Sequence, residues 1–377
     1  MSVGKINLGS TRMIHNPKSA AKPAAISNSM PEFNYLTTHV GSVPHTDARD
    51  LNARLLSMLD IPCWLQLVCR DFRENIYTQY APTLPGAVVL EDAEKAIIDT
   101  SAASFDSALE SFYQSVIDDA VEAFALRPDY AQGFYALRDA LTSNPTKYAK
   151  GQVMGPISFG LTVTDQDGRA CLYNEIYVDV LVKHMSFNAR WQVEQLQKVS
   201  EQVILFVDEP YMASFGSAYI NLSREQVIAW LDEVYEALHA EEALTGTHCC
   251  GNTDWGVLLN TQVDILNLDA YDFIENLALY PVELREFLDR GGAICWGLIP
   301  NNNHIFHETP GLLAGKLQDG IKLICEKAAK RGVTIRPDEF ASRSLLAPAC
   351  GLGPATIEIA ERAFDVLRET SEILKRG

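Results

Sequence analysis

The amino-acid sequence predicts a (β/α)8 TIM barrel, a fold in which eight parallel strands alternate with helices. Eight short apolar runs with strand character occur along the chain, and segments with helical periodicity separate most of them. Such alternation is typical of a parallel sheet covered by helices. A length of 377 residues suits one barrel of this kind. Polar and metal-binding side chains follow several runs directly, at the strand end where barrel enzymes carry their active sites. A doubly wound sheet is the alternative fold.

The N-terminal half of the chain is expected to supply an arm and the first three strands. Residues 1–33 show little periodicity and are predicted to be an N-terminal arm, which leaves 34–377 as a single catalytic barrel domain. The first three strands are expected over residues 35–40, 61–68 and 151–154. A helix is expected from Asp47, and outer helical elaborations are expected over 92–125 and 128–142. The polar and aromatic segment 70–86 is predicted to be a long loop, a type that often carries function.

The C-terminal half is expected to supply the other five strands. They are predicted over residues 202–207, 243–246 with its continuation to His248, 263–268, 293–296 and 343–347. Helices are predicted over residues 174–201, from Ser223 onward, 310–330 and 354–374. Ser223 followed by Gln226 forms the pattern of a capping box at a helix start. Pro354 suits the first turn of the last helix, where its missing N–H costs nothing.

Composition and charge exclude several classes of function. The chain has 31 basic and 49 acidic side chains, a formal net charge of −18, which argues against nucleic acids and anionic membranes as partners. No apolar run approaches the roughly 18 residues of a membrane span. The N-terminal stretch lacks the apolar core of a signal peptide, so a cytoplasmic location is expected. The eight cysteines are then expected to be free or metal-bound thiols.

The stretch Thr247-His248-Cys249-Cys250 carries the strongest chemical signal. Side chains alternate between the two faces of a strand, so His248 and Cys250 are expected on one face and Cys249 on the other. An imidazole and a thiolate side by side form half of a tetrahedral zinc site. Cys350 and Asp269 each follow another strand-like run and are the candidates for the other half. A histidine with buried cysteines and no metal is the alternative interpretation.

With these residues in place, the chain resembles the catalytic half of cobalamin-independent methionine synthase over roughly residues 34–375. That half belongs to a superfamily with uroporphyrinogen decarboxylase and the zinc-dependent methylcobalamin:coenzyme M methyltransferases. The resemblance rests on six motifs in the same order: His39-Val40-Gly41-Ser42-Val43-Pro44, Gly155-Pro156, Val207-Asp208-Glu209-Pro210, Thr247-His248-Cys249-Cys250, Val263-Asp264-Ile265 through Asp269, and Pro348-Ala349-Cys350-Gly351-Leu352.

The resemblance implies roles for individual residues of this chain. The zinc ligands of the family fall on His248, Cys250, Asp269 and Cys350. The family's Gly-Ser turn, which holds an amino acid carboxylate through backbone donors, falls on Gly41 and Ser42. Asp208 matches the aspartate that binds the substrate amine. Glu209 is included in the predicted substrate site, with structural support of its neighbours as the alternative.

The chain departs from the family pattern in four ways. Asp269 stands where the family has a zinc-binding Glu, and it is shorter by one methylene, so a small strand movement or a water has to fill the gap. Cys295-Trp296-Gly297 stands where the synthases carry a proton-handling His. The acidic motif for the homocysteine amine is not recognisable, and the N-terminal half of the long synthases has no counterpart.

The predicted function is therefore zinc-dependent transfer of a methyl group to a thiol, as in methionine biosynthesis. Homocysteine or another small thiol is the expected acceptor. Methylcobalamin, free or on a corrinoid protein, is expected as donor in preference to methyltetrahydrofolate, because the acidic surface repels a polyglutamate tail. Two alternatives are a decarboxylase like uroporphyrinogen decarboxylase and a non-catalytic zinc-binding barrel. The first needs basic pocket residues, whereas the motifs at the strand ends are acidic or soft.

Overall fold

The computed structural model describes residues 30–218 and 220–376. The described residues from Pro31 onward form one compact unit. The N-terminal arm predicted over residues 1–33 lies almost entirely outside the described residues. Among the residues described, no helix is long and apolar enough to cross a membrane.

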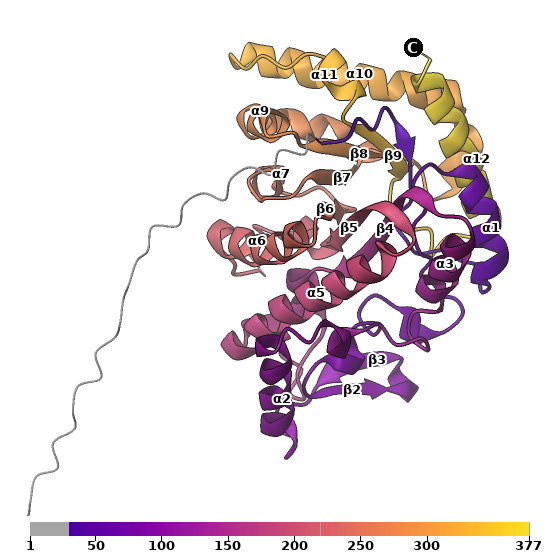
Figure 1. Ribbon diagram of the computed structural model, residues 1–377. Helices are drawn as coiled ribbons and strands as arrows, with labels where there is room; N and C mark the ends of the chain where they lie inside the picture. The colour runs from indigo at the N-terminus through magenta and orange to yellow at the C-terminus, as the bar shows by residue number, and fades with distance from the viewer. Residues whose placement is uncertain (1–29, 219, 377) are drawn as a thin grey trace, which may run out of the picture. The chain divides into compact units, whose positions relative to one another are not determined.

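A curled parallel sheet of seven strands forms the centre of the unit (Figure 1). Its strands follow the order β1-β9-β8-β7-β6-β5-β4, and every neighbouring pair is parallel. The strands are β1 (Leu36–Thr37), β4 (Thr146–Met154), β5 (Ser200–Asp208), β6 (Leu244–Cys249), β7 (Ile265–Asp269), β8 (Ala293–Ile299) and β9 (Ser344–Pro348). Seven of the eight predicted strands are therefore present, in a half-barrel sheet that resembles a TIM barrel.

The eighth predicted strand, over residues 61–68, is not a strand of this sheet. The segment instead makes two isolated parallel bridges, from Cys63 to Lys150 on β4 and from Gln66 to Ser42 beyond β1. The Pro62 carbonyl accepts a 2.7 Å hydrogen bond from the N–H of Lys150, and the N–H of Trp64 donates to the Lys150 carbonyl at 3.4 Å, but Pro62 has no N–H with which to extend the pairing. The prediction of a closed barrel of eight strands was wrong at this position. The ladder of hydrogen bonds between neighbouring strands is interrupted there, because Pro62 lacks the N–H that would continue it.

The helices lie outside the sheet. They are α1 (Ala48–Met58), α2 (Phe105–Ile117), α3 (Gln132–Ser143), α4 (Pro156–Thr162), α5 (Glu175–Leu196), α6 (Arg224–Ala240), α7 (Trp255–Leu259), α8 (Ala270–Phe273), α9 (Pro281–Asp289), α10 (Pro310–Lys330), α11 (Asp338–Ala341) and α12 (Ile357–Leu374). Helices α5, α6, α7 and α9 follow one another in the order of the strands (Figure 1). The capping box predicted at Ser223 is confirmed, with both of its reciprocal hydrogen bonds to Gln226.

One outer segment differs from the prediction. The helix predicted over 92–125 is divided into strand β3 (Lys95–Ile98), helix α2 and a short 3-10 turn (Val121–Phe124). Strand β3 pairs with β2 (Ala87–Leu90) in a small antiparallel sheet of its own. Each of these strands is a short apolar run, and pairing between the two runs competes successfully with helix formation.

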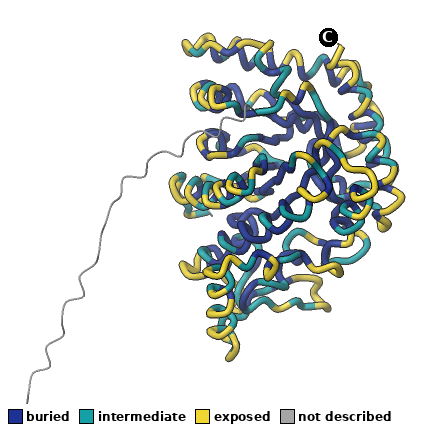
Figure 2. Tube along the Cα trace, in the orientation of Figure 1, coloured by how far each residue is buried: buried dark blue, intermediate teal, exposed yellow. Residues whose placement is uncertain are grey.

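The strands are buried and the outer helix faces are exposed, as Figure 2 shows. All seven residues of β8 and all five of β9 are buried. Continuous burial along a strand is typical of a parallel sheet that is covered on both faces. Side chains beyond the carboxyl ends of the strands are therefore held by a rigid support.

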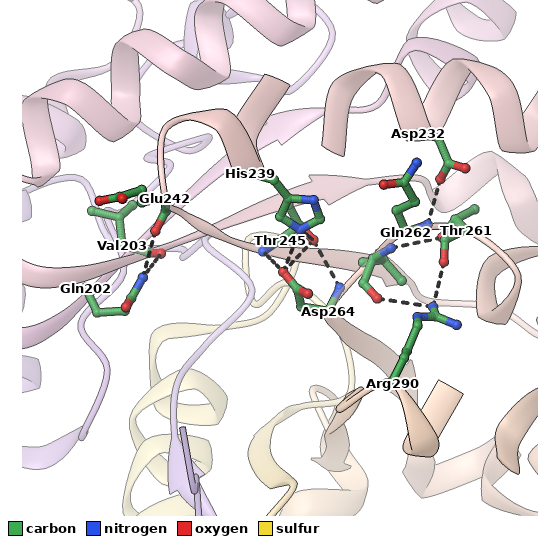
Figure 3. A network of polar contacts seen from close by, with 11 residues as sticks. Gln202, Val203, Asp232, His239, Glu242, Thr245, Thr261, Gln262, Asp264 and Arg290 are labelled. Carbon is green, nitrogen blue, oxygen red and sulfur yellow. Dashed lines mark hydrogen bonds and ion pairs between the residues drawn. The ribbon is translucent and has the colours of Figure 1, made fainter. Parts of the chain in front are cut away.

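A polar network lies at the amino ends of the strands, at the opposite end from the candidate site (Figure 3). The carboxylate of Asp264 accepts hydrogen bonds from the N–H and hydroxyl of Thr245, at 2.8 and 3.0 Å, and pairs with His239 at 2.9 Å. Arg290 donates to the carbonyls of Leu259 and Thr261 at 2.9 and 2.6 Å. These contacts join β6 to the segment before β7 and so help to set the register between the two strands.

Candidate metal centre

Three of the predicted zinc ligands meet at the carboxyl ends of β6 and β9. One ligand atom from each of His248, Cys250 and Cys350 lies within 4.8 Å of the other two. Cys249 points away from this group and is fully buried, and its thiol donates to the Gly251 carbonyl at 3.5 Å. The alternation predicted for this stretch is therefore confirmed. The curl of the sheet brings together residues about 100 positions apart in the sequence.

Asn267 on β7 sets the orientation of the His248 ring. Its Nδ2 donates to the Cys295 carbonyl at 2.7 Å, so its Oδ1 faces His248 Nδ1 at 2.6 Å. His248 Nδ1 must then carry the proton, which leaves the lone pair on Nε2. Nε2 is buried and has no hydrogen-bond partner among the described residues. A nitrogen presented in this way suits a metal ion.

The two thiols of the group are coupled. A hydrogen bond with the Cys350 thiol, followed by interactions with His248, lowers the pKa of Cys250. The same hydrogen bond, followed by burial, raises the pKa of Cys350. Cys250 is therefore the first of the two to become a thiolate. Both residues are only half-buried, so they line the open side of the group.

Asp208 lies beside His248, because these two residues are register partners of β5 and β6. Its side chain is buried, and Oδ1 has no hydrogen-bond partner among the described residues. Burial raises the pKa of Asp208, and the charges of His248 and Lys150 lower it in part. A buried carboxylate oxygen without a partner is costly unless a ligand binds to it.

Glu209 points in a different direction from Asp208. Its carboxylate accepts hydrogen bonds from the N–H groups of Ile157 and Ser158, at 3.0 and 2.7 Å, and from the Ser158 hydroxyl at 2.5 Å. It thus holds the start of α4, and a Cβ at Gly155 would lie 2.0 Å from Glu209 Oε1. Burial raises the pKa of Glu209 to about 7. Contact of this carboxylate with a substrate would require these hydrogen bonds to break.

The predicted turn at Gly41 and Ser42 packs against the loop that carries Cys350. Gly41 has a φ of +142°, which favours glycine. Ser42 accepts hydrogen bonds from the N–H of Leu352 to its carbonyl at 2.9 Å and from the N–H of Gly353 to its Oγ at 3.3 Å. The end of the first strand therefore supports the third member of the metal group.

Asp269 is not a member of the group within 4.8 Å. Its Oδ1 accepts a hydrogen bond from the N–H of Asp272 at 3.0 Å and caps α8. Burial raises the pKa of Asp269 to about 6. Direct binding of a metal by Asp269 would require this cap to open. With the cap intact, Asp269 would reach the ion only through a water.

Sequence reasoning missed two residues that the structure brings close to the site. Asn267 is a polar residue within the buried run of β7, and that contrast was the available signal. Lys150 is a charged residue within the buried part of β4, with the same kind of signal. Neither was assigned a role from its motif or its run, because each acts through a partner that is distant in the sequence.

Comparison with known proteins supports the fold. No protein-family model and no curated protein matches the chain. The structure of a B12-independent methionine synthase from Shewanella sp. W3-18-1 in complex with selenomethionine matches with a TM-score of 0.53 and 16% identity, over 90% of this chain and 97% of that one. A putative vitamin-B12 independent methionine synthase from Listeria monocytogenes matches with a TM-score of 0.54 and 12% identity, over 91% and 97%. This chain shares their fold.

Proposed function

We propose that this protein is a zinc-dependent methyltransferase that methylates a small thiol. The observation that carries the proposal is the buried His248 Nε2, which has no hydrogen-bond partner among the described residues and belongs to a group with two thiols. The fold shared with two B12-independent methionine synthases supports the same class of reaction. Imidazole and thiolate are ligands that zinc prefers, and the open side of the group leaves a position for a substrate.

His248, Cys250 and Cys350 would hold the zinc ion, which, when bound, lowers the pKa of a substrate thiol while the sulfur remains nucleophilic. Asp269 completes the site through a water or after release of the α8 cap. Asp208 offers its free oxygen to the amine of an amino acid thiol. The backbone N–H groups of the turn at Gly41 and Ser42 bind the carboxylate. The chain thereby holds the sulfur in line with the methyl group, and alignment of this kind supplies much of the acceleration.

The proposed methyl donor is a methylated corrinoid, free or on a carrier protein. The formal net charge of −18 disfavours a polyglutamylated folate. In the proposed step the thiol releases its proton to solvent water, the sulfur forms a bond to the methyl carbon, and the carbon–cobalt bond breaks. Both electrons of that bond stay on cobalt, so methylcob(III)alamin becomes cob(I)alamin. Homocysteine is the proposed acceptor, and other small thiols with an amine and a carboxylate fit the same groups.

The test combines metal analysis with a methyl-transfer assay. Purified protein is expected to contain about one zinc per chain. Zinc-loaded protein with homocysteine is expected to convert methylcobalamin to cob(I)alamin, which is followed by absorbance, and to form methionine. Cys350→Ala is expected to lose zinc and activity, whereas Cys325→Ala, which replaces a buried cysteine of α10 outside the group, keeps both. Turnover with methyltetrahydrofolate and none with methylcobalamin would refute this donor. Full zinc retention in Cys250→Ala and Cys350→Ala alike would refute the site.

A further inference from the structure

Lys150 is a buried lysine inside the sheet that the proposed reaction does not yet use. It lies on β4, and only 1% of it is exposed. Its Nζ donates to the Val40 carbonyl at 3.2 Å and to Cys63 Sγ at 3.4 Å, and it lies 4.4 Å from the centre of the Phe206 ring. These contacts fix the ammonium group between β4, β5 and the segment that follows β1.

The ammonium group has no carboxylate partner. A buried lysine is expected to pair with a carboxylate, yet Lys150 takes part in none of the ion pairs found within residues 30–218 and 220–376. Burial of an unpaired charge is costly, so its field acts on whatever polar groups surround it. Burial raises the pKa values of Asp208 and Cys63, and the charge of Lys150 offsets part of each rise. The interior next to the candidate site thus carries a fixed positive potential.

The hydrogen bond from Lys150 determines which way the next peptide group faces. The Val40 carbonyl points toward the ammonium group, so the N–H of Gly41 in the same trans peptide points away from it. Neither this N–H nor that of Ser42 donates a hydrogen bond to any described residue. A Cβ at Gly41 would lie 2.6 Å from Gln152 Nε2, so the turn also needs glycine at this position. Two free N–H groups with a positive charge behind them favour an anion.

We propose that Lys150 is a positioning residue for a carboxylate subsite at Gly41 and Ser42, and that it makes the protein select thiols that carry a carboxylate. The inference rests on the proposed function, because the sulfur of the same molecule has to reach the His248 group. Lys150 orients the Gly41 N–H through Val40 and adds its charge behind the bound carboxylate. Asp208, on the neighbouring side, binds the amine, so an amino acid thiol satisfies both groups.

The test compares homocysteine with 3-aminopropane-1-thiol, which is the same molecule without its carboxylate. Binding of each thiol to zinc-loaded protein is measured by titration calorimetry. Wild-type protein is expected to bind homocysteine at least about tenfold more tightly. Lys150→Gln keeps a donor for the Val40 carbonyl and removes the charge, and Lys150→Met removes both. Each is expected to lower the affinity for homocysteine about tenfold and to leave the affinity for 3-aminopropane-1-thiol within about twofold. Lys147→Met, on the exposed part of β4, is the matched control and is expected to change neither affinity.

The outcomes separate this inference from the proposed function. If Lys150 had a purely structural role, its replacement would weaken the binding of both thiols equally. That result would overturn this inference and leave the proposed function standing. Equal binding of the two thiols by wild-type protein would also overturn it, whatever the variants do, so the test does not depend on their folding. Wild-type protein that binds zinc but neither thiol would overturn the proposed function and this inference with it.

Discussion

Asn267 lies in an apolar strand, yet its side chain sets the orientation of the His248 ring in the candidate site. Its two side-chain atoms bond to different partners, the Cys295 carbonyl and the ring of His248, so its amide cannot turn. The tautomer of His248 follows from this arrangement. Groups that orient a metal ligand in this way affect metal affinity nearly as much as some ligands do.

Replacement of Asn267 by Ala is expected to lower zinc affinity about 10–100-fold, because the His248 ring loses its fixed tautomer and orientation. The affinity is measured by competition with a chelator of known affinity. Asn260→Ala, which removes an amide that bonds only to the Gly256 carbonyl at the end of α7, is the control. Unchanged affinity in Asn267→Ala would mean that His248 does not bind the metal through Nε2.

Glu209 provides a prediction of pH dependence. Burial raises its pKa from the ordinary value of 4.5 to about 7, so the folded state binds this proton more tightly than the unfolded state. The resulting stability is fully present below about pH 4.5 and is lost as the pH rises through about 7. Glu209→Gln has no such proton, so the difference in Tm between wild type and variant is expected to shrink or reverse over this range. A constant difference from pH 4.5 to 7.5, measured by thermal melts, would contradict a raised pKa.

At the scale of structural elements, the turn after β1 and the loop after β9 form one support for Cys350. A Cβ at Gly351 would lie 2.2 Å from Ser42 Oγ but 3.6 Å from Ser42 Cβ. The hydroxyl oxygen of Ser42 is therefore the atom that excludes a side chain at position 351. The close approach couples two elements that are more than 300 residues apart in the sequence.

Gly351→Ala is expected to destabilise this contact by about 1–3 kcal/mol through overpacking, and to weaken zinc binding because Cys350 moves with the loop. In a Ser42→Ala background the same change is expected to cost much less, since the clashing oxygen is gone. The four proteins of this double-mutant cycle are compared by unfolding in urea and by zinc affinity. Additive costs would show that the two elements are not coupled at this point.

At the scale of the whole molecule, we expect the candidate metal centre to be an addition to a fold that does not depend on it. The core runs continuously from Val43 to Leu374 within the described residues, and the candidate ligands lie at its edge. A domain of this size needs no metal to fold, in contrast to small zinc-stapled domains. Zinc that binds only the folded state still adds stability by mass action.

Removal of metal with a chelator is therefore expected to leave the far-UV circular dichroism unchanged. Addition of zinc at about 100 times its Kd is expected to stabilise the fold by about 2.7 kcal/mol, seen as a rise in Tm. Cys350→Ala is expected to show a much smaller rise. Loss of the fold on chelation would show that the centre is structural and would favour the interpretation as a non-catalytic zinc-binding barrel.

Local sequence patterns were sufficient for most of the elements and for the grouping of three members of the candidate site. Strand periodicity identified seven strands of the sheet, and the alternation at His248 and Cys250 was predicted from two adjacent residues. The capping box at Ser223 was predicted from residues three positions apart. These features depend on near neighbours in the chain, whose spacing determines which side chains share a face.

The tertiary structure alone decided the rest. The interrupted strand pairing at Pro62 and the hydrogen bonds between Glu209 and the start of α4 depend on partners that no local pattern identifies. Lys150 meets the Val40 carbonyl across 110 residues, and His248 meets Asn267 because β6 and β7 pair in one register. The sequence by itself determined which residues lie at the carboxyl ends of the strands. Packing and register, which act over long distances along the chain, decided which of them meet.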